Sequence, residues 1–310
     1  MNATIALPTI SPEDVESYEE NGFLVVPDAL SPAEVDELRA DTLAICRGNW
    51  GDVGNLPDFD GSETDDEILE QVLCIHQIHK ISPIMHRALA QRTMKDTLTK
   101  IIGPNVKCMQ SMLFIKAAGK PGQAWHQDEF YIPTRDRSLT GGWIALDDAT
   151  VENGCLWVIP CSHKRGIIWP QRSHDDRRFD CAGEAYQFPY SDEDSIPVEV
   201  KAGAIVFFNG YLLHRSLPNV TTSGYRRCLV NHYMSAESLL PWRSQDGVAP
   251  AKADHRDIVM IAGEDPYDYK GVVDGTRPHV RASGEGGCQD RRTKPSDAAV
   301  SEDKAELTTA

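Results

Sequence analysis

The chain has 310 residues, 41% of them hydrophobic, which is enough apolar material for one large folded domain or two small ones. Its formal net charge of -16 comes from residues 1–75, where 18 acidic residues stand against two arginines, so no basic surface suggests nucleic acid or an anionic membrane as a partner. The first residues lack the pattern of a signal peptide and no run approaches 18 apolar residues, so we expect a cytoplasmic protein outside the membrane.

The first hundred residues carry clear helix-start signals. Ser11-Pro12 and Ser31-Pro32 each combine an N-cap residue, a proline at the first helical position and an acid three residues after the cap. Between these two helices, Phe23–Val26 is predicted to form a short strand. Residues 48–66 are rich in Gly, Asp, Asn and Pro and predict a long loop. Ser82-Pro83 opens a further helix that we expect to run towards Gly103.

From about residue 105 the pattern changes to short runs rich in Val, Ile, Phe and Trp, separated by Gly and Pro turn signals. Several strands without intervening helices are typical of a sandwich or barrel rather than of βαβ units. The runs are NVKCMQSMLFIKAA, GGWIALDD, GCLWVIP, PVEV, AIVFF and CLVNHYMS.

We therefore expect a single domain over residues 1–275, with a helical part at 1–104 and a β-rich core at 105–240. Residues 276–310 are polar, Gly-rich and non-periodic, which predicts a disordered tail. The eight cysteines form no C-x-x-C pair, and a chain of this length does not need disulfides to fold. We expect them to be reduced and mostly buried.

A possible metal site begins at His126-Gln127-Asp128. On an extended segment, side chains two residues apart point to the same face, so His126 and Asp128 can aim an imidazole and a carboxylate at one point. His214, just after the apolar run AIVFFNGYLL, is the best third ligand. Two histidines and one carboxylate leave three coordination positions open, as non-haem Fe(II) oxygenases require. Taken alone, the H-x-D motif also occurs by chance, and a lone histidine beside an apolar strand is more often structural.

A matching cosubstrate site follows His214. Arg226 lies 12 residues later, after a hairpin-like turn, and is predicted to begin a strand that returns beside the His214 strand. A planar guanidinium binds a carboxylate such as the distal one of 2-oxoglutarate with two charge-assisted hydrogen bonds. Arg227 should point to the opposite face, and either arginine could instead be a surface cation. We favour Arg226 as the inward one.

Together these residues resemble the phytanoyl-CoA dioxygenase family of Fe(II)- and 2-oxoglutarate-dependent oxygenases. The resemblance covers about residues 12–235 and rests on H-x-D, on ENGCLWVIP followed by Ser162-His163, and on the spaced H, S, N and G-Y-R after residue 213. It implies a mainly β fold with flanking helices, the double-stranded β-helix or cupin-like jelly roll.

The resemblance also implies the roles of particular residues. Fe(II) would be held by His126, Asp128 and His214, and 2-oxoglutarate would be bound by Arg226, with Ser216, Trp143 and Gln110 as further contacts. Asp128 favours hydroxylation over halogenation, because halogenases of this kind lack the acidic ligand. Where relatives have Gly, this chain has Cys161, which must adopt a strained or different turn if that position has a positive φ.

The implied activity is hydroxylation of a small organic molecule or secondary metabolite, using O2 and releasing succinate and CO2, with ascorbate as a supporting reductant. Desaturation, epoxidation or ring closure would use the same metal ligands. The chain shows no basic cluster for the phosphates of CoA, which favours a smaller substrate. Loops at the barrel mouth would line the substrate pocket, with Trp50 as a lid. Further pocket candidates are Phe130, Tyr131, Arg135, Arg137 and Trp157.

Two other functions remain open at this point. The chain could be a jelly-roll binding protein without catalytic activity, although complete metal ligands speak against that. It could also be a cupin-like metalloenzyme that uses Zn²⁺ or Mn²⁺ without 2-oxoglutarate, which would not need an arginine for a second carboxylate.

Overall fold

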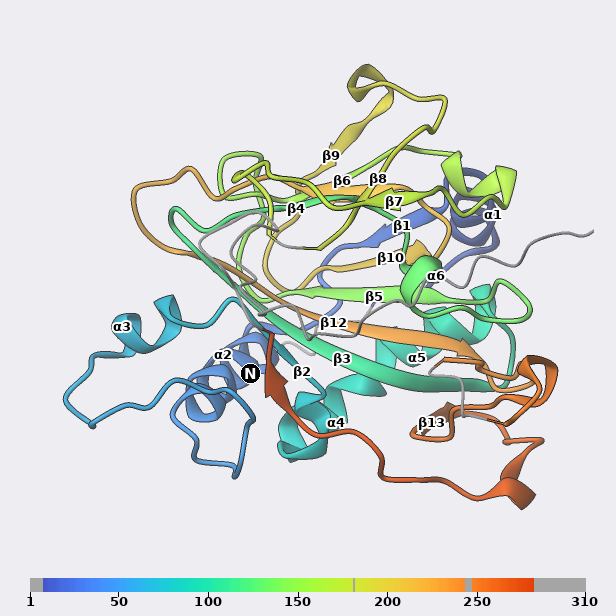
Figure 1. Ribbon diagram of the computed structural model, residues 1–310, viewed down its shortest axis with the longest axis horizontal. Helices are drawn as coiled ribbons and strands as arrows, with labels where there is room; N and C mark the ends of the chain where they lie inside the picture. Colours follow the sequence, from blue (N-terminus) through green and yellow to red (C-terminus); the bar gives the residue numbers. More distant parts are fainter. Residues whose placement is uncertain (1–7, 181, 243–246, 282–310) are drawn as a thin grey trace, which may run out of the picture.

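The computed structural model describes residues 8–180, 182–242 and 247–281 and contains two antiparallel sheets that face each other (Figure 1). The larger sheet has eight strands: β1 (Phe23–Val26), β10 (Ile205–Asn209), β5 (Thr140–Ala145), β12 (Tyr225–Ser235), β3 (Val106–Ala117), β2 (Cys74–His76) and β14 (His279–Val280) in this order, with β13 (Val259–Ala262) also paired to β3. The smaller sheet contains β4 (Gln123–His126), β11 (His214–Ser216), β6 (Leu156–Val158) and β9 (Ile196–Val198). A separate pair joins β7 (Gln171–Arg172) to β8 (Glu184–Ala185).

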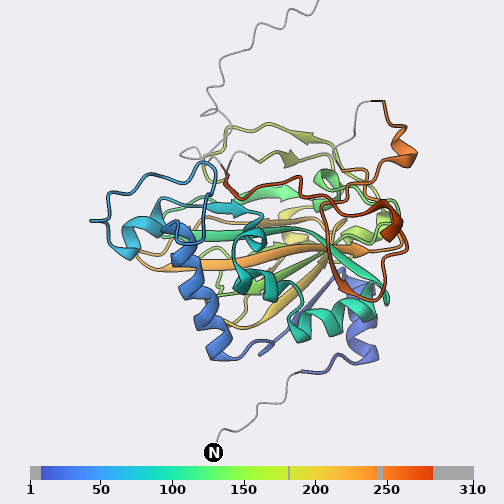
Figure 2. The same ribbon diagram turned by 90° about the horizontal axis from the view of Figure 1, so that it is seen from below.

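Helices cover the outer face of the larger sheet. Figures 1 and 2 show α2, α4 and α5 against the face that points away from the smaller sheet. The helices are α1 (Pro12–Asn21), α2 (Pro32–Cys46), α3 (Asp65–Glu70), α4 (Pro83–Leu89), α5 (Arg92–Ile101) and the short α6 (Asp128–Tyr131). Single 3-10 turns lie at Ile78–Lys80, Ser162–Arg165, Asp192–Asp194, Pro250–Lys252 and Asp268–Lys270. The predicted caps of the first two helices are confirmed as complete capping boxes on Ser11 and Ser31.

The helix expected to run from Ser82 to Gly103 is in fact two helices. α4 ends where Ala90 leaves the helical conformation (φ -116, ψ 27), and α5 begins after Gln91. The Gln91 side chain accepts a hydrogen bond of 3.1 Å from the backbone N–H of Met94 and so caps the second helix. We did not predict this cap from the sequence, because it contains neither a serine nor a proline.

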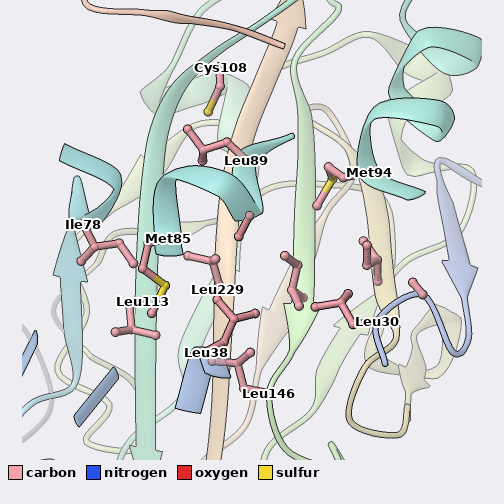
Figure 3. Close-up of a cluster of buried hydrophobic side chains, with 14 of the residues drawn as sticks. Leu30, Leu38, Ile78, Met85, Leu89, Met94, Cys108, Leu113, Leu146 and Leu229 are labelled. Atoms are coloured by element: carbon pink, nitrogen blue, oxygen red, sulfur yellow. The ribbon is translucent and has the colours of Figure 1, made fainter. Parts of the chain in front are cut away.

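Two apolar layers hold the molecule together. One lies between the helices and the larger sheet, where Figure 3 shows Met85 and Leu89 of α4 above Leu113 of β3 and Leu229 of β12. The other lies between the two sheets and includes Trp143. Burial of this apolar surface is the main stabilising contribution to such a fold. The expected jelly-roll arrangement of two facing sheets is therefore present.

The chain continues in regular structure beyond the predicted end of the domain. His279 and Val280 form β14, which pairs with His76 and Ile75 of β2. The prediction of a disordered tail from residue 276 is wrong for residues 276–281, because this edge pairing was not visible in a two-residue run. The remainder of the expected tail, 282–310, lies outside the described residues.

The described cysteines are all free, and five of the six are buried, as expected. They are Cys46, Cys74, Cys108, Cys155, Cys161 and Cys228. Within the described ranges, no helix combines the length and the apolar character needed to cross a membrane.

Candidate metal and cosubstrate site

The two candidate histidines lie opposite each other on neighbouring strands of the smaller sheet. β4 ends at His126, β11 begins at His214, and the antiparallel register pairs these two residues directly. Oδ1 of Asp128 lies 3.8 Å from Nε2 of His126 and 3.6 Å from Nε2 of His214. One ligand atom from each of these three residues lies within 4.8 Å of the other two, so together they could hold a single metal ion.

Hydrogen bonds prepare both imidazoles for metal binding. Nδ1 of His126 donates to the carbonyl of Ala124 at 2.8 Å, and Nδ1 of His214 donates to the carbonyl of Leu212 at 3.0 Å. Each Nε2 therefore keeps its lone pair, which is the tautomer that a metal needs. Burial lowers the pKa of His126 to about 3, so this ring is neutral at physiological pH. Burial alone would raise the pKa of Asp128, but the neighbouring imidazoles lower it below its usual value.

The side chains of His126 and Asp128 point to one place, as expected for two residues on either side of an extended one. The strand ends at His126, and Asp128 begins α6 after the extended Gln127. The Gln127 carboxamide donates to the carbonyls of Ile167 (3.0 Å) and Tyr211 (2.7 Å), away from the histidines. Because Gln127 is extended (φ -129, ψ 130), the carboxylate of Asp128 and the imidazole of His126 leave the same side of the chain, although Asp128 already belongs to α6.

A third histidine, which the sequence did not reveal, contacts the candidate carboxylate ligand. Nε2 of His232 lies 3.0 Å from Oδ2 of Asp128, the oxygen that is not directed at the other two rings. His232 lies on β12, six residues after Arg226. Every second side chain of a strand points to the same face, so residues six apart share a face. The expectation that Arg226 points inwards could therefore have predicted that His232 does so too.

A cavity next to the three candidate ligands contains a buried cation. Arg226 is only 4% exposed, its guanidinium lies 5.7 Å from the centre of the Trp143 ring, and it lines the same cavity as the two histidines. Its Nε is buried without a hydrogen-bond partner, and no described carboxylate forms an ion pair with it. Arg227 points the other way and binds both oxygens of Asp147 at 2.8 Å. The side chain of Arg226 therefore points inwards, as expected.

The predicted location of Arg226 in the fold is wrong, however. β12 pairs with β3 and β5 in the larger sheet, whereas β11 belongs to the smaller sheet. Arg226 therefore reaches the cavity from the wall opposite His214, and not from an adjacent strand. The turn between His214 and Arg226 crosses from the smaller sheet to the larger one. A hairpin-like sequence does not show whether the strands on its two sides pair with each other or belong to different sheets.

The three secondary cosubstrate candidates divide between two cavities. Trp143 and Ser216 line the cavity with Arg226, whereas Gln110 lines a second cavity, where its Nε2 lies 3.3 Å from Nδ1 of His76. Lys116 was not predicted as a site residue from the sequence. It is 2% exposed and lines the same cavity as Arg226.

The second cavity, of about 380 Å³, also reaches His126 and Asp128. Its wall is rich in uncharged hydrogen-bonding groups. Gln77 has a left-handed backbone (φ 60), is 2% exposed, and its Oε1 has no hydrogen-bond partner. A strained backbone and an unpartnered polar atom in one residue are typical of a functional site. Other lining residues are His76, Gln110, Gln123, Tyr131, His232, Trp242, His279 and Arg281.

Of the residues expected to form the pocket wall, Tyr131 lines the second cavity and the others line neither. Trp50 is not a lid, because its indole N–H donates to Asp41 at 2.6 Å, next to α2. Arg135 donates to the carbonyl of Ala251. The remaining three, Phe130, Arg137 and Trp157, also lie outside both cavities.

Cys161 occupies a conformation that favours glycine, as the sequence suggested. Its φ is 63°, it precedes the 3-10 turn at Ser162–Arg165, and its N–H donates to the carbonyl of Asn21 at 3.0 Å. A side chain in this region is unfavourable, so the turn is maintained by its surroundings.

Comparison with known proteins agrees with this geometry. A family model described as Phytanoyl-CoA dioxygenase (PhyH) matches residues 18–228, more than half of the chain. The chain belongs to the phytanoyl-CoA dioxygenase family. A relative from Oryza sativa subsp. japonica, named phytanoyl-CoA dioxygenase 1, is 29% identical over 268 residues, which cover 77% of this chain and 93% of the relative. Membership confirms the expected class, an Fe(II)- and 2-oxoglutarate-dependent dioxygenase.

Solved structures of such oxygenases share the fold. The carbocyclase SnoK from nogalamycin biosynthesis, described as non-heme and alpha-ketoglutarate-dependent, has a TM-score of 0.59 at 21% identity, covering 83% of this chain and all of SnoK. EvdO2 from Micromonospora carbonacea var. aurantiaca, solved with 2-oxoglutarate, has a TM-score of 0.57 at 22% identity, covering 80% of this chain and 98% of EvdO2. These likenesses confirm the jelly-roll fold.

Proposed function

We propose that this chain hydroxylates a small polar molecule, with Fe(II) held by His126, Asp128 and His214 and with the distal carboxylate of 2-oxoglutarate bound by Arg226. One observation carries the proposal. A buried arginine without a carboxylate partner among the described residues lines the same cavity as two imidazoles and a carboxylate. A buried cation is costly unless an anion compensates it, and 2-oxoglutarate supplies that anion.

The donor set fits Fe(II), because two imidazoles and one carboxylate leave three coordination positions for other ligands. When bound, iron and 2-oxoglutarate together supply the oxidising chemistry, with succinate and CO2 as products. The chain provides orientation: His232 binds the oxygen of Asp128 that points away from the other rings, and Trp143 packs against the Arg226 guanidinium. Ser216 lines the same cavity as Arg226 and offers a hydroxyl to the same carboxylate.

The second cavity supports a polar substrate smaller than an acyl-CoA. Its lining groups are mostly carboxamides, imidazoles and aromatic rings, which bind hydroxyl, amide or carboxylate groups. Among the described lining residues, Arg281 is the one Arg or Lys, and Asp180 forms an ion pair with it. That wall offers no basic cluster for the phosphates of CoA.

The test of the cosubstrate is a titration of 2-oxoglutarate into the anaerobic Fe(II)-loaded protein, followed by the visible charge-transfer band of the chelate. We expect the band in the wild type, a much weaker affinity in Arg226→Ala, and an unchanged affinity in Arg227→Ala, because Arg227 is already paired with Asp147. His126→Ala should lose Fe(II) itself. A loss in Arg227→Ala and not in Arg226→Ala would show that the wrong arginine was chosen.

Succinate release under air separates the remaining alternatives. A binding protein without activity would form the chelate but release no succinate, and a cupin-like Zn²⁺ or Mn²⁺ enzyme would form no chelate at all. For the substrate, phytanoyl-CoA should not increase succinate release above the substrate-free rate. An increase with phytanoyl-CoA would contradict the proposal of a small polar substrate.

A further inference from the structure

Two buried cations lie directly opposite each other in the candidate cosubstrate cavity. In the antiparallel register of β12 and β3, Arg226 pairs with Lys116, so both side chains leave the same face of the larger sheet. Arg226 is 4% and Lys116 is 2% exposed, and both line the cavity. Like charges at such a position destabilise a sheet, and more so when they are shielded from water.

No described carboxylate forms an ion pair with Lys116. Its Nζ donates to the carbonyls of Leu217 (2.7 Å) and Gly154 (3.2 Å) and to Oγ of Ser216 (2.9 Å), and all three acceptors are uncharged. A side chain at position 154 would come within 2.8 Å of Nζ, so glycine there leaves room for the ammonium group. The site therefore holds the ammonium group through uncharged acceptors alone.

Lys116 also determines what Ser216 can do. Oγ of Ser216 accepts from Nζ of Lys116 at 2.9 Å and from the backbone N–H of Gln123 at 3.2 Å. A hydroxyl oxygen has two lone pairs and one proton, so both acceptor positions are used when Lys116 is protonated. The proton of Ser216 is then left to donate into the cavity that this residue lines.

We propose that Lys116 is a positioning residue for 2-oxoglutarate: it supplies a second positive charge near the distal carboxylate and makes the Ser216 hydroxyl a donor to it. This inference rests on the proposed function of the site. The proposal adds Lys116 of β3 to Arg226 and Ser216 as groups that act on the distal carboxylate. It also explains why two positively charged side chains lie side by side in the larger sheet.

The electrostatics of the cavity favour the binding of an anion. Burial, followed by the nearby charge of Arg226, lowers the pKa of Lys116 well below its usual value. The thiols of Cys228 and Cys155 and the carboxylate of Asp180 are the other titratable groups that act on it. A bound carboxylate would offset both unfavourable effects, because an opposite charge favours the protonated amine.

The test compares two 2-oxo acids of five carbons that differ at the distal end. 2-Oxoglutarate ends in a carboxylate and 2-oxovalerate ends in a methyl group, while both chelate a metal through the same keto acid. Each is titrated into anaerobic Fe(II)-loaded wild type and Lys116→Met, with the chelate absorbance as the readout. We expect Lys116→Met to bind 2-oxoglutarate at least about 10-fold more weakly, the loss typical of one charged hydrogen bond, and to bind 2-oxovalerate as the wild type does.

Lys107→Met is the matched control. Lys107 lies on the same strand, is fully buried, and donates to the carbonyl of Ser238 at 2.6 Å, but it lines neither cavity. It should leave the ratio of the two affinities unchanged. An equal loss for both acids in Lys116→Met, or no loss for either, would overturn the inference, because a role in folding alone does not distinguish the distal groups.

Ser216→Ala tests the same relation without removing a buried charge, and it decides the matter if Lys116→Met does not fold. This variant should also weaken 2-oxoglutarate and spare 2-oxovalerate, and a wild-type affinity for both acids would overturn the role given to Lys116 through Ser216. A wild type that binds Fe(II) but neither acid would instead refute the proposed function itself, so the two failures are distinguishable.

Discussion

At the scale of single residues, three histidines and not two surround the carboxylate of Asp128. His126 and His214 face its Oδ1, and His232 is within 3.0 Å of its Oδ2. A carboxylate whose second oxygen accepts a hydrogen bond cannot rotate freely, so its first oxygen stays directed at the metal position. We therefore expect His232 to orient the carboxylate of Asp128 without binding the metal itself.

We predict that His232→Leu weakens Fe(II) binding by about 10- to 100-fold, because partners that orient a metal ligand typically contribute that much. The dissociation constant would be measured under anaerobic conditions by competition with a coloured chelator. His86→Gln, a change at an exposed histidine on α4, is the control and should have no effect. An unchanged Fe(II) affinity in His232→Leu would show that Asp128 is held by other contacts.

At the scale of elements, two strand registers build the site. The pairing of β11 with β4 sets His214 against His126, and the pairing of β12 with β3 sets Arg226 against Lys116. The first pair belongs to the smaller sheet and the second to the larger one. A shift by one residue in either register would turn these side chains to the opposite face, so the function depends on both registers being held.

Helix α2 affects stability without touching either cavity. Ser31 caps α2: its Oγ accepts from the N–H of Glu34 at 3.3 Å, and the Glu34 carboxylate accepts from the N–H of Ser31 at 2.7 Å. We predict that Ser31→Ala lowers the free energy of unfolding by about 1 kcal/mol, measured by urea denaturation. Ser173→Ala, at an exposed position in a loop, should change it little. The Fe(II) affinity of Ser31→Ala should match that of the wild type, and a large loss would mean that α2 supports the metal site.

At the scale of the whole molecule, the site joins the two sheets. The proposed ligands His126 and His214 come from the smaller sheet, whereas Trp143, Lys116 and Arg226 come from the larger one. Ligands that bind only the folded state stabilise it in proportion to the logarithm of their concentration. Iron and 2-oxoglutarate should therefore raise the melting temperature together.

We predict that 2-oxoglutarate at about 100 times its dissociation constant adds about 2.7 kcal/mol to the free energy of unfolding when Fe(II) is present, and far less when the metal is removed by a chelator. Differential scanning calorimetry under anaerobic conditions would measure this. His126→Ala should abolish the dependence on Fe(II). A stabilisation by 2-oxoglutarate that is equal with and without metal would mean that the keto acid does not bind through the metal.

Short-range signals in the sequence determined much of the fold. Phe23–Val26 was predicted as a strand with its observed bounds, and Ser11 and Ser31 were predicted as caps. These features depend on a few neighbouring residues, so their physical cause lies within the segment itself. The motifs around His126 and His214 also predicted residues that the structure brings together. Such motifs consist of residue types at fixed spacings, which can be read directly from the sequence.

The tertiary structure decided what depends on contacts between distant segments. Only the pairing of β12 with β3 put Arg226 in the larger sheet and Lys116 beside it, and only packing brought His232 to Asp128. The prediction of Trp50 as a lid was wrong because the sequence of a long loop does not show that the indole N–H donates to Asp41. The residues of the sequence thus determined the chemistry available to this protein, whereas strand order and register, set by long-range burial and hydrogen bonding, decided which of those residues meet.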